Sequence, residues 1–187
     1  VLFAIILLGE AIAVLAASSG AVVTAGDRVG PLIAVGVSAL VVIFGLWWLY
    51  FLQPTGDGLA AHRGGSFFWG YGHYFVFASL GAFGAGIEVV TTFAGGHSGV
   101  AAVVAMASVC IPVALYLVAL IVAHVRILPG IRVHFWIVVP AAVLILALPF
   151  AAPALGVPVA FGGVALLVVL AVAATLVLVR RKVGATQ

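Results

Sequence analysis

The chain has 187 residues, of which 67% are hydrophobic and 6% are charged. Soluble domains carry about 25% charged residues, so this composition excludes a soluble globular protein. Seven Lys or Arg residues stand against four Asp or Glu, but the basic residues flank apolar segments, where they serve as membrane anchors rather than as a nucleic-acid surface. We therefore predict an all-α integral membrane protein that lies in a lipid bilayer and binds no nucleic acid.

Six segments are long and apolar enough to cross a bilayer, whose core of about 30 Å needs roughly 20 helical residues. In chain order they cover about residues 1–20, 31–52, 67–93, 99–125, 133–149 and 158–179. We expect the fifth helix to break near Pro149 and Pro153, since proline disrupts the preceding helical turn. The sequence predicts a six-helix transmembrane bundle, with residues 1–187 forming a single transmembrane domain.

The first residues, VLFAIILLGE, lie directly in an apolar run and lack the basic region of a signal peptide. This start predicts that further helices of the same protein precede residue 1. The expected partners of the bundle are therefore these upstream helices of the same chain and a second copy of the protein in a homo-oligomer.

The basic residues predict the orientation of the chain. With six spans, one side of the membrane carries Arg63, Arg126, Arg132, Arg180, Arg181 and Lys182. The other side carries Arg28 alone, next to Asp27. Cytoplasmic loops are enriched in Lys and Arg, so we expect both ends of residues 1–187 to be cytoplasmic.

Only two carboxylates, Glu10 and Glu88, lie well inside apolar segments. A charge at the centre of the membrane costs about 2.5–3.5 kcal/mol, so such residues normally face the protein interior or a water-filled cavity. At 1.5 Å per residue, Glu10 lies roughly 15 Å and Glu88 roughly 10 Å from the outer surface. The two acids can therefore meet if the first and third helices are neighbours.

Glu88 shares a helix face with Tyr74, Gly81 and Gly84, by the 100° that each helical residue turns. Small residues in membrane helices allow a neighbouring helix to approach closely. We expect this face of the third helix to be packed, with the Glu88 side chain against another helix. A structural alternative stays open, in which both acids are protonated and hydrogen-bonded to neighbouring helices.

Two histidines are expected at similar depth near the cytoplasmic end. His73 lies in the third helix, about two-thirds of a bilayer away from Glu88, and His124 lies near the end of the fourth helix. The residues predicted to handle protons or ions, or to bind a ligand, are Glu10, Glu88, His73, Tyr74 and His124.

Three segments resemble one protein family. They are LFAIILLGEAI at 2–12, GLWWLYF at 45–51 and WGYGHYFVFASLGAFGAGIE at 69–88. Their order and spacing resemble the bacterial low temperature requirement A family. The resemblance implies a multi-pass protein of the bacterial inner membrane, with an upstream half that carries an FFDLVFV-like helix. Leu52 departs from the family, which often has Asp at this place. The family name records a growth trait and implies no particular chemistry.

Three functions are compatible with these residues. The first is proton-linked transport or ion handling without a cofactor, because intramembrane carboxylates and histidines form proton relays. The second is electron transfer by a haem with His73 and His124 as its two ligands. The third is a structural or lipid-responsive protein without catalysis. Retinal binding is excluded, since the sole lysine, Lys182, lies beyond the last span. The sequence favours a protein that is not an enzyme, and no Ser–His–Asp set at one depth indicates a hydrolase.

Overall fold

The computed structural model describes residues 2–24, 29–52, 66–125 and 132–184. This part of the chain folds into helices without strands, and six helices are long and apolar enough to cross a membrane. Their bounds are α1 Leu2–Thr24, α2 Val29–Phe51, α4 Ser66–Gly95, α5 Ala102–Val125, α6 Arg132–Leu155 and α7 Val157–Gly184. The predicted fold class is confirmed.

The fifth span differs from its prediction. Helix α6 continues through Pro149 and Pro153 and ends at Leu155, so the expected break near the two prolines is wrong. The break falls one residue later, at Gly156, whose φ of +83° suits glycine and whose N–H donates to the carbonyl of Ala152 at 2.9 Å. An open backbone inside a bilayer lacks water as a hydrogen-bond partner, which favours a continuous helix despite the prolines.

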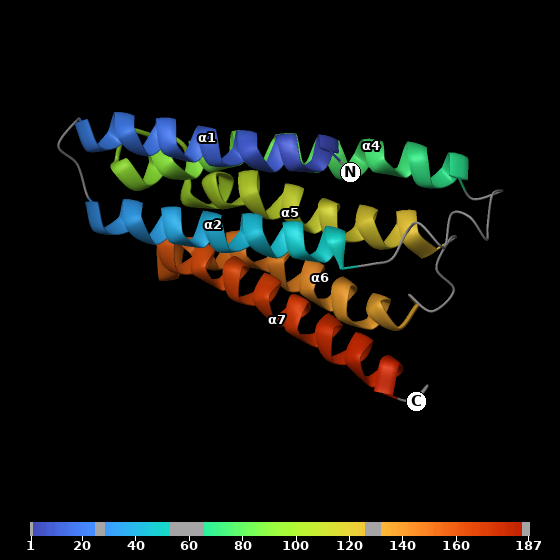
Figure 1. Cartoon of the computed structure of the whole chain (residues 1–187). Coiled ribbons are helices and arrows are strands. Elements are labelled where there is room, and N and C mark those ends of the chain that lie inside the picture. Colours follow the sequence, from blue (N-terminus) through green and yellow to red (C-terminus); the bar gives the residue numbers. More distant parts are fainter. Residues whose placement is uncertain (1, 25–28, 53–65, 126–131, 185–187) are drawn as a thin grey trace.

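The helices lie side by side along one common direction (Figure 1). Helix α4 packs against α1 and α5, α6 joins α5 to α7, and α7 returns to α2. Helices α1 and α4 run in the same direction, and α1 begins toward the end of the bundle where α7 terminates (Figure 1). Helices α1 and α4 are therefore direct neighbours, which is the arrangement that a contact between Glu10 and Glu88 would require.

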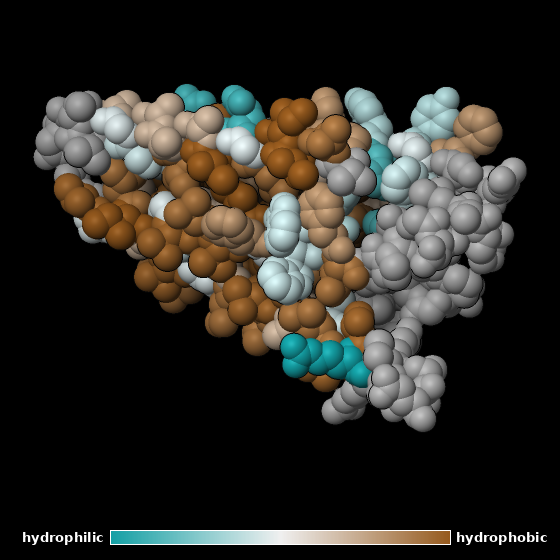
Figure 2. Space-filling model, in the orientation of Figure 1, coloured by the Kyte–Doolittle hydropathy of each residue, from teal (hydrophilic) through white to brown (hydrophobic). Residues whose placement is uncertain are grey.

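The surface of the bundle is largely apolar. Hydrophobic colours cover most of the length of the helices in Figure 2. Phe44, Trp136 and Leu166 are among the exposed large apolar side chains, while Phe83 and Phe161 are fully buried. A surface of this kind is stable only against lipid, so the bundle is a polytopic membrane protein.

One hydrogen bond ties α5 to α2 inside this core. The Tyr116 hydroxyl, 1% exposed, donates to the Leu46 carbonyl at 2.8 Å. We expect Tyr116→Phe to lower the free energy of unfolding by about 0.5–1.5 kcal/mol, the usual net contribution of one hydrogen bond. Thermal melting in detergent measures this change. Tyr74→Phe is the matched control, because the Tyr74 ring is 69% exposed, and equal melting shifts for both variants would contradict the prediction.

Candidate functional site

The structure brings His73 and His124 together. His73 of α4 is 5% exposed and His124 of α5 is 2% exposed, and their ring centroids lie 6.3 Å apart. The neighbouring residues explain this approach: a Cβ atom built on Gly72 would lie 3.2 Å from the Cβ atom of Ala123. Since Gly72 has no side chain, α4 and α5 touch beside the two histidines. The predicted common depth of the pair agrees with this geometry.

Both imidazole rings are held by their own helices. Nδ1 of His73 lies 2.7 Å from the Trp69 carbonyl oxygen, and Nδ1 of His124 lies 2.6 Å from that of Leu120. A carbonyl oxygen only accepts hydrogen bonds, so each Nδ1 carries a hydrogen and donates it. When the ring is neutral, Nε2 therefore has no hydrogen and offers a lone pair.

Two further polar side chains lie beside His73. The Trp69 and Tyr50 rings have centroids 4.1 Å and 5.8 Å from that of His73. The Tyr50 hydroxyl and the Trp69 Nε1 atom are both buried, without a hydrogen-bond partner in the described part of the chain. Buried hydroxyl and indole groups normally find a partner, so these two unpaired donors call for an explanation. We call the four residues Tyr50, Trp69, His73 and His124 the histidine cluster.

Tyr50 and Trp69 were not among the residues predicted from the sequence. Both belong to the aromatic segments on either side of the 53–65 stretch, a pattern typical of residues at the membrane–water interface. Trp47 and Trp48 are indeed exposed, whereas Tyr50 is buried. Only the packing of α2 against α4 and α5 separates the two kinds of aromatic residue.

The other predicted site residues lie elsewhere. Glu10 and Glu88 are both exposed on the outer surface, and Tyr74 is exposed as well. Gly81 is also exposed, with nothing within 4 Å of a Cβ atom built on it. The expectation that Glu88 lies on a packed face of α4 is therefore wrong: of that face, Gly84 packs against Ala11 of α1, while Gly81 and Glu88 turn outward.

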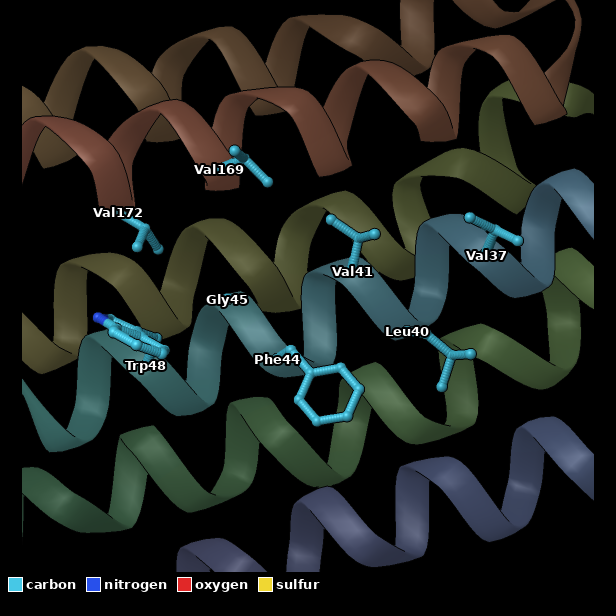
Figure 3. Close-up of a pocket in the computed structure, with 8 residues that line it drawn as sticks. All are labelled: Val37, Leu40, Val41, Phe44, Gly45, Trp48, Val169 and Val172. Atoms are coloured by element: carbon cyan, nitrogen blue, oxygen red, sulfur yellow. The ribbon is translucent and has the colours of Figure 1, made fainter.

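An apolar groove between α2 and α7 is separate from the histidine cluster. Its volume is about 380 Å³, and it is lined by apolar residues that include Phe44, Trp48 and Val169 (Figure 3). Without a polar group it has no means of orienting a polar ligand.

In the described part of the chain, no group of three or more His, Cys, Asp or Glu residues could hold a metal ion.

Comparison with known proteins identifies the family. The family model described as bacterial low temperature requirement A protein (LtrA) matches residues 1–177, nearly the whole chain. No curated protein and no solved structure matches the chain. The match covers α1 to α6 and most of α7, and it includes the three segments that carry the resemblance. The chain therefore belongs to the bacterial low temperature requirement A family.

Proposed function

We propose that this protein handles protons at the histidine cluster, and that proton transfer there is linked to transport. The observation that carries the proposal is the buried pair of His73 and His124, with ring centroids 6.3 Å apart. Histidine is the side chain that gains and loses a proton near neutral pH. Ionisable groups inside a membrane protein are costly and commonly mark ion or proton pathways.

The hydrogen bonds of the pair suit proton transfer. Nδ1 of each ring stays bonded to a carbonyl oxygen in both protonation states, so the ring keeps its orientation while Nε2 accepts or releases a proton. The Tyr50 ring, whose centroid lies 5.8 Å from that of His73, carries a hydroxyl that can both donate and accept a hydrogen bond. Proton exchange at Nε2 therefore leaves the hydrogen bond that orients each ring in place.

The orientation with both ends cytoplasmic belongs to the same proposal. Of the six basic residues assigned to this side from the sequence, Arg63 and Arg126 lie outside the described residues. The other four belong to the start of α6 and the end of α7, on the side to which α2 leads and from which α4 starts: Arg132, Arg180, Arg181 and Lys182. By the distribution of Lys and Arg this side is the cytoplasm, and the membrane is the bacterial inner membrane. The histidine cluster then lies near the cytoplasmic surface, where protons enter or leave.

Haem ligation by His73 and His124 stays a second prediction. The direct approach of Gly72 to Ala123 favours proton transfer between the rings over a porphyrin between the two helices. A visible absorption spectrum of the purified protein separates the two: a Soret band would support the haem.

Proton flux into liposomes tests the proposal. We expect His73→Asn and His124→Asn each to lower the flux driven by a pH gradient, roughly a hundredfold, the lower end of what a positioned proton-transfer group contributes. Asparagine retains an N–H donor for the helix carbonyl but does not titrate. His97→Asn, in the exposed turn after α4, is the control and keeps the wild-type flux. Wild-type flux in a folded double variant would refute the proposal.

A further inference from the structure

The outer side of the α1–α4 pair carries two carboxylates. Glu10 and Glu88 are exposed, and neither carboxylate takes part in a hydrogen bond or ion pair within the described part of the chain. Both belong to helices long and apolar enough to cross the membrane, away from the helix ends. Their surroundings are therefore neither water nor the interior of the six-helix bundle.

The two acids lie along the line of contact between α1 and α4. It starts where the Phe3 and Phe77 rings meet, with centroids 4.9 Å apart. Farther along, a Cβ atom built on Gly84 would lie 3.8 Å from the Cα atom of Ala11. Glu10 follows Phe3 by about two helical turns and Glu88 follows Phe77 by about three, so each acid shares its helix face with one of the phenylalanines.

The same surface is open to a further helix. Of the six spans, α1 has the smallest buried share, 22%, against 50% for α4. A Cβ atom built on Gly9 of α1 or Gly81 of α4 would meet nothing within 4 Å. Glycines at such places allow the backbone of another transmembrane helix to approach closely.

Charge decides what kind of helix fits. A carboxylate against lipid costs about 2.5–3.5 kcal/mol at the helix centre, and this face carries two. Every Lys and Arg of the chain lies before, between or at the end of the apolar segments. A second copy laid on this face would therefore bring further acids and no cation.

We propose that the α1–α4 face with Glu10 and Glu88 binds a transmembrane helix from outside residues 1–187, which carries a cationic or amide side chain at the depth of the two acids. Hydrogen bonds from this side chain satisfy the carboxylates, as polar pairs do between membrane helices. The inference is independent of proton transfer at the histidine cluster.

Photo-cross-linking in membranes of the cell that makes the protein tests this inference. A photoreactive amino acid at position 81 lies on the exposed side of α4, about two helical turns before Glu88. One at position 166 of α7, where Leu166 is 59% exposed, is the lipid-facing control. We expect position 81 to cross-link to a transmembrane peptide from outside residues 1–187, with Arg, Lys, His, Asn or Gln within one turn of the linked residue. Position 166 is expected to give lipid adducts.

Charge removal supplies the second readout. In Glu10→Gln/Glu88→Gln, the cross-link yield at position 81 should fall several-fold, and replacing the donor of the captured helix with Leu should lower the yield equally. Lipid adducts alone at position 81, a peptide without such a donor, or a peptide from a second copy of residues 1–187 would each overturn the inference. So would an unchanged yield in the double Gln variant.

Discussion

We expect Gly86→Ala to lower the melting temperature of the bundle, although alanine is the better helix former. A Cβ atom at this position would overlap the carbonyl oxygen of Ser108 and lie 2.7 Å from its carbonyl carbon. These are backbone atoms of α5 and cannot rotate away, so α4 and α5 must separate. Overpacking of this kind costs about 1–3 kcal/mol, which thermal melting in detergent detects.

Gly81→Ala is the matched control on the same helix. Gly81 is exposed and has nothing within 4 Å of its built Cβ atom, so only helix propensity changes. Alanine is favoured over glycine by about 1 kcal/mol inside a helix, and the melting temperature should stay equal or rise. A Gly86→Ala variant as stable as Gly81→Ala would contradict the close contact of α4 and α5.

We expect Gly72→Leu to destabilise the fold and to disturb the histidine cluster. Because even a Cβ atom on Gly72 would lie 3.2 Å from the Cβ atom of Ala123, the remainder of a leucine side chain must push α4 from α5. We expect a loss of about 1–3 kcal/mol of stability. We also expect the proton flux to fall as far as in His73→Asn, because the rings of His73 and His124 then move apart.

Gly70→Leu is the control for this variant. Gly70 precedes Gly72 by two residues, is exposed and has open space around its built Cβ atom. The melting temperature should stay equal or rise, because leucine is a better helix former than glycine, and the proton flux in liposomes should match the wild type. Wild-type proton flux in both variants would show that the spacing of the His73 and His124 rings has no bearing on proton transfer.

Hydropathy and helix geometry predict much of this protein. Span length alone is sufficient for the six helices, because a bilayer requires a fixed length of apolar helix. Counting residues along α4 and α5 also places His73 and His124 at one depth, where the structure brings them together. Depth along a helix is set by its regular rise, and needs no knowledge of neighbours.

Whether Glu10 and Glu88 are buried or exposed could not be predicted in this way. A helical wheel shows that Gly81, Gly84 and Glu88 share a face, but not how far a neighbouring helix covers it. Helix α1 covers Gly84, while Gly81 and Glu88 stay exposed. The same holds for Tyr50, which is buried where α2 packs against α4 while Trp47 and Trp48 of the same segment are exposed. These features depend on helix packing, which no local pattern encodes.

Nitrogen NMR on histidine-labelled protein in lipid bilayers tests the central claim most directly. We predict that both cluster rings, when neutral, carry hydrogen on Nδ1 and a bare Nε2, since each Nδ1 donates to a helix carbonyl. On acidification Nε2 gains a proton, and because the rings are close, the two titrations are coupled. His124→Asn should therefore change the titration of His73. Rings that carry hydrogen on Nε2 at every pH, or a His73 titration unaffected by His124→Asn, would contradict the histidine pair as a proton-transfer site.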